Sequence, residues 1–409
     1  ELVAEGSVNA GIVEEDITKA TQVEVVAAGE EVIEKTPSSF DRSVAPVPGP
    51  DPSITIPEVW KSEASNGMKI FGIGQHELPL VAYSIVIEGG HMLDDPSKPG
   101  VARFTASMLN EGTKNRTPEQ LEEEIQLLGA TINIGCSDER ITVSVNTLAR
   151  NFEKTLALVQ EMLLEPRWDE EQFSLNKTRT INNLKRSLAD PNYVAGAAFD
   201  KLVMGADNVL SVDLSGTVES VEAITMDDLK SFYEKNISPA VANFLVVGDI
   251  DQARVEKTLA GLSEKWAAKE VLMPTLTFPA LPEKSGVYFV DVPDAKQSVI
   301  NIGTLSLPRT DPDYYKAVVS NHLLGGGASA KLFMVLREEK GFTYGAYSNF
   351  MGQKSYGAFQ AYASVRSDAT LESVELFRDI MAEYRAGVPQ EIVDFTKGIN
   401  NGNAIFVVT

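Results

Sequence analysis

Apolar residues recur at strand or helix spacing along most of the chain after Trp60. Residues 80–88 alternate between apolar and polar positions, as in a strand with one buried face. Thr117 and Gln120 predict a capping box at the start of a helix that Gly129 ends. The strands expected in this first part are 80–88, 140–147 and 243–248, and the expected helices are 101–109, 118–128, 151–164, 168–205 with a break at Asp190-Pro191, and 226–235.

The same order of elements returns in the second part of the chain. LEEEIQLLGATINI (121–134) and LFMVLREEKGFTYGAYS (332–348) each describe a helix that a glycine stops and a strand follows. The expected elements of the second part are strands 298–305 and 357–365 and helices 313–324, 329–339 and 370–384. We therefore expect an α+β fold of two duplicated units, each an antiparallel sheet covered by helices on one face. The second unit is expected to be incomplete at its C-terminus.

The composition of the first sixty residues differs from that of the rest. Prolines cluster at 46–57 after an acidic, weakly patterned segment, which is typical of an extended connector. The sequence therefore predicts a linker over 1–60, a first α+β domain over 61–280 and a second over 281–409. Pro274, Pro279 and Pro282 indicate the connector between these two domains, at about 268–285.

Charge and composition exclude several function classes. The formal net charge is −22, so the chain repels a phosphate backbone and nucleic acid is not the expected partner. No apolar run is long enough for a transmembrane segment. The single cysteine, Cys136, excludes an internal disulfide framework and a cysteine-built metal site. The three histidines, His76, His91 and His322, leave little room for a histidine-built metal site, and the second and third are expected to be structural.

Two segments carry candidate chemistry. The glycine run 325–327 lacks the glycine before Lys331 that a phosphate-binding loop requires, so we expect a turn between helices, with Ser329 capping the second helix. Arg337 and Tyr344 flank Gly341 and could meet on one surface. The residues alone leave open a second interpretation, in which Arg337 only compensates the helix dipole and Tyr344 packs at a strand edge.

From Asn66 onward the sequence resembles the pitrilysin/insulinase family of zinc metallopeptidases, including its bacterial processing-protease branch and the mitochondrial processing peptidase. The resemblance rests on NGMKIFGIGQHELPLVAYSIVIEGGHMLDD near the start and on SKPGVARFTASMLNEGT at 97–113. DRSVAPVPGPDP (41–52) resembles the connector before the second half of fused two-half members. The resemblance implies a mitochondrial-processing-peptidase-like fold. A bacterial periplasmic or cell-envelope location is implied by the resemblance alone.

The sequence departs from the family at the zinc site. Active members carry H-x-x-E-H, in which two histidines bind zinc and the glutamate activates water. Arg103 and Ser107 stand where the histidines belong, Ala106 where the base belongs, and Asn183 where the third ligand, a glutamate, is expected. Neither Arg nor Ala offers zinc a ligand, and Ser and Asn do not replace an imidazole and a carboxylate. We therefore expect no metal and no other cofactor in this chain.

The second half resembles the family's non-zinc half, in which an arginine and a tyrosine reach into the zinc site of the other half. This implies that Arg337 and Tyr344 act in trans on a zinc site that an H-x-x-E-H-bearing partner half or subunit supplies, with peptides as substrates. The partner could be a separate subunit or a fused half of the same polypeptide. Two alternatives remain: a scaffold subunit without a role in proteolysis, and a stand-alone peptide-binding module. On the first hypothesis, the isolated chain is inactive.

Overall fold

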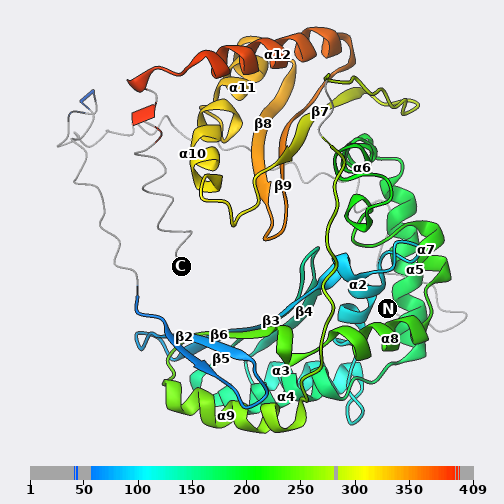
Figure 1. The fold of residues 1–409 in the computed structure, drawn as a ribbon, viewed down its shortest axis with the longest axis vertical. Helices are drawn as coiled ribbons and strands as arrows, with labels where there is room; N and C mark the ends of the chain where they lie inside the picture. Colours follow the sequence, from blue (N-terminus) through cyan, green and yellow to red (C-terminus); the bar gives the residue numbers. More distant parts are fainter. Residues whose placement is uncertain are drawn as a thin grey trace, which may run out of the picture. The chain divides into compact units, whose positions relative to one another are not determined.

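The first sheet is built from strands that lie far apart in the sequence (Figure 1). In the computed structural model the described residues are 57–280, 284–391, 393, 394 and 396, with Asp41, Ser43 and Val44. In this part of the chain the sheet has the order β1-β2-β6-β3-β5-β4. Its strands are β1 (Trp60–Glu63), β2 (Lys69–Gly74), β3 (Leu80–Glu88), β4 (Thr131–Cys136), β5 (Arg140–Leu148) and β6 (Ala242–Gly248).

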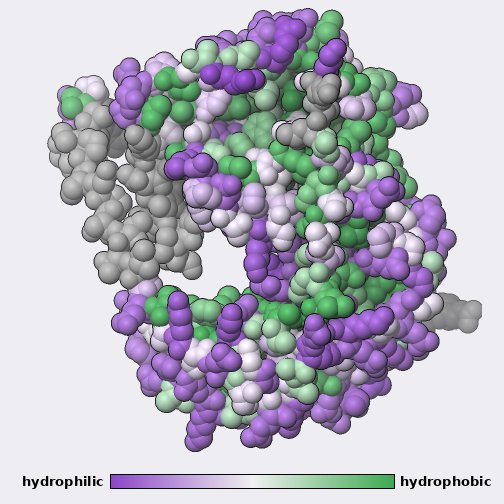
Figure 2. All heavy atoms as spheres, in the orientation of Figure 1, coloured by the Kyte–Doolittle hydropathy of each residue, from purple (hydrophilic) through white to green (hydrophobic). Residues whose placement is uncertain are grey.

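Alternation along the strands gives this sheet one buried and one exposed face. In β3, Val81, Tyr83, Ile85 and Ile87 are buried in the main core. Helices cover the buried face (Figure 1), because each presents one apolar stripe to it. On the other face Leu80, Leu245 and Val247 are exposed. Figure 2 shows a band of hydrophobic side chains along the first sheet.

The second sheet has the order β7-β9-β8 within the described residues. Its strands are β7 (Gln297–Ser306), β8 (Thr343–Gly352) and β9 (Gly357–Arg366). β9 pairs antiparallel with both neighbours, as β5 does with β3 and β4. The chain order β3-α2-α3-β4-β5-α4 also returns as β7-α10-α11-β8-β9-α12. The predicted α+β class and the repeated order of elements are confirmed, and the second sheet is the smaller one.

The helices agree closely with the sequence pattern. Thr117 accepts a hydrogen bond from the backbone N–H of Gln120, whose side chain accepts from the N–H of Thr117, so the predicted capping box is present. Asp190 caps the helix that begins at Pro191, which explains the predicted break. The helices are α2 (Val101–Met108), α3 (Pro118–Leu127), α4 (Phe152–Leu164), α5 (Glu170–Ser187), α6 (Pro191–Met204), α7 (Val218–Ala223), α8 (Met226–Asn236), α9 (Gln252–Lys265), α10 (Tyr314–Gly325), α11 (Lys331–Phe333) and α12 (Thr370–Ala386).

Several details differ from the sequence expectation. β1, α7 and α9 were not among the expected elements. β2 and β6 pair in parallel, which the long intervening chain with β3, β4, β5 and several helices permits. Ser329 does not cap a helix, since α11 begins at Lys331 after Ala330. The helix expected at 329–339 is α11 followed by a π-helical turn, Met334–Glu339.

The predicted domain boundaries remain predictions. The linker over 1–60 lies outside the described residues up to residue 56, apart from Asp41, Ser43 and Val44, and its last residue, Trp60, belongs to β1. The connector expected at 268–285 forms neither strand nor helix in its described residues, 268–280, 284 and 285.

Two sets of contacts join the second sheet to the first part of the chain. Ser364 on β9 donates a hydrogen bond to Asn192 on α6 at 2.9 Å. The turn between β8 and β9 contacts the turn between β4 and β5. There the Glu139 carboxylate, whose residue is only 7% exposed, accepts from the backbone N–H groups of Lys354 (2.7 Å) and Ser355 (2.8 Å).

Candidate functional site

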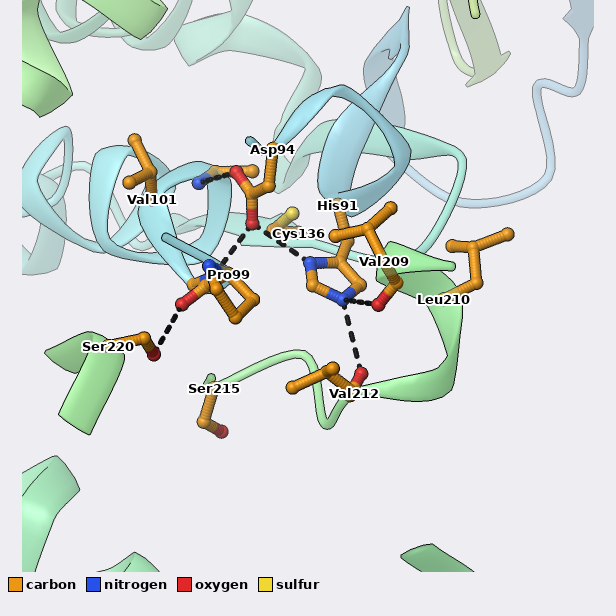
Figure 3. A network of polar contacts seen from close by, with 12 residues as sticks. His91, Asp94, Pro99, Val101, Cys136, Val209, Leu210, Val212, Ser215 and Ser220 are labelled. Carbon is orange, nitrogen blue, oxygen red and sulfur yellow. Dashed lines mark hydrogen bonds and ion pairs between the residues drawn. The ribbon is translucent and has the colours of Figure 1, made fainter. Parts of the chain in front are cut away.

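The segment that departs from the zinc motif lies on α2, whose N-terminus a buried carboxylate caps. Asp94 accepts hydrogen bonds from the backbone N–H groups of Gly100 and Ala102, each at 2.7 Å. These groups belong to the helix end, where N–H donors lack partners and negative charge is favoured. The carboxylate therefore fixes the start of α2 (Figure 3).

His91 holds this carboxylate from the other side (Figure 3). Its Nδ1 lies 2.9 Å from Asp94 Oδ2, and its Nε2 lies 3.0 and 3.1 Å from the carbonyl oxygens of Val209 and Val212. Burial alone lowers the pKa of His91, but hydrogen bonding and charge from Asp94 raise it above its ordinary value. Because both ring nitrogens face acceptors, the protonated imidazolium fits best. The histidine is a fully buried structural residue.

The three replaced positions on α2 have other partners. Arg103 donates a hydrogen bond to the Ser215 hydroxyl. Ala106 is buried, and the Ser107 hydroxyl accepts from the Asn176 amide at 3.4 Å. An arginine and an alanine present no ligand atoms for zinc, so this surface of α2 does not fit that metal.

The third replaced position lies on α5. Asn183 accepts a hydrogen bond from Arg186, one turn further along the same helix. Asn176, two turns earlier on α5, is the residue that reaches Ser107, and its amide also lies 3.4 Å from Glu111 Oε1. Within the described residues no three His, Cys, Asp or Glu side chains converge as metal ligands. The side chains around the replaced positions are guanidinium groups, amides, hydroxyls and the carboxylate of Glu111.

Arg337 projects from the π-helical turn Met334–Glu339. The wide turn is closed by the backbone N–H of Lys340, which donates to the carbonyl of Val335 at 3.0 Å. Gly341 ends the turn with φ +63°, as expected from its place in the sequence. The guanidinium carbon of Arg337 lies 4.8 Å from the ring centroid of Phe333, and its side chain is 44% exposed. π-Helical turns are frequent at functional sites.

Tyr344 lies on an irregular stretch of β8. The pairing with β9 shifts between Thr343 and Ala346, which places Tyr344 and Gly345 in a β-bulge. The Thr343 hydroxyl accepts from the Gly345 N–H at 3.1 Å and lies 2.7 Å from the Ser364 carbonyl, to which it can donate. Tyr344 is 87% exposed. Bulges redirect side chains next to active sites.

Sequence reasoning selected Arg337 and Tyr344 and expected His91 to be structural, but it missed the partners of His91 and Ser107. Asp94 follows His91 by three residues, a spacing that is only a weak signal of a buried pair. Nothing in the sequence indicates a role for Asn176, because that role depends on how α5 packs against α2. Whether Arg337 and Tyr344 act together remains a prediction.

Two descriptions of known protein families match separate parts of the chain. The description "Insulinase (Peptidase family M16)" matches residues 74–202, and "Peptidase M16 inactive domain" matches residues 223–399. The chain therefore belongs to the M16 peptidase family, the insulinase/pitrilysin family, and carries both its N-terminal and its inactive C-terminal domain.

The similar proteins include one named as a protease and one named as a non-peptidase. The chain is 24% identical to an uncharacterized zinc protease of Streptomyces coelicolor, over 79% of this chain and 71% of that protein. It is 26% identical to the non-peptidase homolog YmxG of Helicobacter pylori, over 79% and 74%. A crystal structure of the peptidase M16 inactive domain from Pseudomonas fluorescens matches with a TM-score of 0.79 and 25% identity, covering 85% of this chain and 84% of that one.

Proposed function

We propose that this chain is the non-catalytic half of an M16-type zinc peptidase. It completes the active site and the substrate chamber of a partner half that carries H-x-x-E-H and zinc. The partner is either a separate subunit or a fused half of one longer polypeptide. Substrates are peptides or unfolded segments.

The observation that carries this proposal is the contrast between the two candidate regions. On α2 and α5 the positions of the family's ligands and base are Arg103, Ala106, Ser107 and Asn183, which do not fit zinc. The Arg337 and Tyr344 side chains, in contrast, are kept and exposed, on a π-helical turn and a β-bulge. A chain that served only as a scaffold has no need for either irregularity.

The chemistry assigned to the pair follows from its groups. A phenol donates one hydrogen bond, so Tyr344 stabilises the oxyanion that forms when water attacks a peptide carbonyl at the partner's zinc. A guanidinium offers five donors in a fixed geometry, so Arg337 holds a neighbouring substrate carbonyl.

A scaffold subunit is the second candidate function. The relative in Helicobacter pylori named a non-peptidase homolog favours it. The two functions differ in one measurable respect, since only the first requires the exposed Arg337 and Tyr344 side chains for proteolysis.

The test is reconstitution. The purified chain should contain no stoichiometric zinc and cleave no peptide by itself. Affinity capture from its source should recover an H-x-x-E-H protein, and the two together should cleave peptides in a chelator-sensitive manner. About one zinc per isolated chain, with chelator-sensitive cleavage, would contradict the proposal, and so would a zinc-bearing partner whose activity is unchanged when this chain is omitted.

A further inference from the structure

The two side chains of the proposed site share an aromatic support. The rings of Phe333 and Tyr347 lie 5.7 Å apart, and those of Tyr347 and Tyr362 lie 6.1 Å apart. Tyr347 and Tyr362 are direct partners across β8 and β9, so their backbones fix this spacing. Phe333, on α11, is only 4% exposed. The three rings form a continuous row from the helix to the sheet.

Arg337 rests on one end of this row. Its guanidinium carbon lies 4.8 Å from the Phe333 centroid, within the range of a cation–π interaction. Its ion pair with Glu338 is 3.4 Å long and half exposed, and such pairs contribute little in water. The ring is therefore the main contact that selects one orientation of the guanidinium.

The bulge that carries Tyr344 rests on the middle of the row. A Cβ atom added to Gly345 would lie 2.6 Å from Cε2 of Tyr347, so the ring lies directly against the bulge. A residue with a side chain does not fit there unless the ring moves. The Thr343 hydroxyl holds the same bulge through the Gly345 N–H.

We infer that Phe333 and Tyr347 are positioning residues, which hold Arg337 and Tyr344 in one fixed relation. Phe333 fixes the orientation of the Arg337 guanidinium. Tyr347 fixes the position of the bulge from which the Tyr344 phenol projects. This inference rests on the proposed function, and its tests separate the two.

The first test uses the chain alone and needs no partner. In NMR spectra, the Nε–H resonance of Arg337 should shift when Phe333→Leu removes the ring current, and it should stay in place in Phe377→Leu. Phe377 is a fully buried core residue on α12 and serves as the matched control. An unchanged Arg337 resonance in Phe333→Leu, or an equal shift in both variants, would overturn the inference.

A second variant covers the case in which Phe333→Leu does not fold. Arg337→Gln changes a half-exposed side chain and keeps the core intact. Loss of the guanidinium should shift the ring resonances of Phe333 and leave those of Phe377 unchanged. Phe333 resonances that do not respond would overturn the inference in the same way.

The last test uses the assembled enzyme. Phe333→Leu should lower kcat/KM about two- to fivefold, the loss expected for one exposed cation–π contact. Tyr347→Leu should lower kcat, whereas Tyr347→Phe, which keeps the ring, should retain it. If Tyr344→Phe and Arg337→Ala already have parental rates, the proposed function fails. If those two lose activity while Phe333→Leu and Tyr347→Leu do not, only the positioning inference fails.

Discussion

Single residues couple the folding of this chain to pH in opposite directions. His91 is buried against Asp94 with a raised pKa, so its charged form belongs to the folded state. Asp200, on α6, has its pKa raised to about 6, first by burial and then by the negative charges of Asp138 and Asp213. Its charged form is therefore disfavoured by folding.

The contribution of His91 to the free energy of unfolding should be lost at high pH. Because its pKa is higher in the folded than in the unfolded chain, the stabilisation is complete below about pH 6.5 and declines as pH rises through the folded value. His91→Gln removes this dependence. We expect the difference in urea midpoint between the parent and His91→Gln to shrink from pH 6 to pH 9. A difference that is constant over this range would show that the pair is not an ion pair.

The Asp200 contribution has the opposite sign. With a folded pKa of about 6 against about 3.9 when unfolded, the carboxyl binds its proton more tightly in the folded chain. The penalty is complete above pH 6 and vanishes as pH falls below about 4. Asp200→Asn should therefore raise the free energy of unfolding at pH 7 by roughly 1 to 3 kcal/mol. Urea titrations at pH 7 and pH 4 measure this, and a gain that persists at pH 4 contradicts it.

At the scale of elements, the two irregularities next to Arg337 and Tyr344 are the parts that the sequence could not predict. Apolar spacing from Leu332 to Leu336 is helical, and nothing in it distinguishes an α-turn from the observed π-turn. The bulge likewise depends on pairing with β9, which the local sequence does not encode. Thr117 and Asp190, by contrast, act on their own helices and were predictable.

Gly345 should be needed for the bulge. Gly345→Ala places a methyl group against the Tyr347 ring and should cost about 1 to 3 kcal/mol, the usual penalty of overpacking. Gly196→Ala is the control, since a Cβ atom there meets nothing within 4 Å and α6 should gain stability. Chemical denaturation of both variants tests this. Equal stabilities would show that the Tyr347 ring moves aside without a cost in stability.

At the scale of the whole molecule, the sequence predicted the duplication but not the contacts between the two copies. The repeated order of strands and helices followed from periodicity, which acts within each unit. The contact of Glu139 with Lys354 joins residues more than two hundred positions apart, and only the folded chain brings them together. The resemblance to the family located Arg337 and Tyr344 where periodicity alone left two interpretations.

Glu139 should hold the turn between β8 and β9 in place. Glu139→Ala leaves the N–H groups of Lys354 and Ser355 without their carboxylate, and hydrogen bonds to charged groups contribute about 1.5 to 3 kcal/mol each. Glu88→Ala, which removes only an exposed ion pair with the Lys354 side chain, should cost less than about 1 kcal/mol. Hydrogen exchange of the two amides should accelerate in Glu139→Ala alone, and equal acceleration in both variants would contradict this.

We propose that this chain contributes Tyr344 to a zinc site on its partner. The most direct measurement is the turnover of several peptides by the assembled enzyme with Tyr344→Phe. Because that variant loses one hydrogen bond made mainly in the transition state, kcat should fall by about 10²-fold while KM changes little. Tyr288→Phe, at another exposed tyrosine, serves as the control. Parental turnover by Tyr344→Phe on all peptides would contradict the account and favour a scaffold.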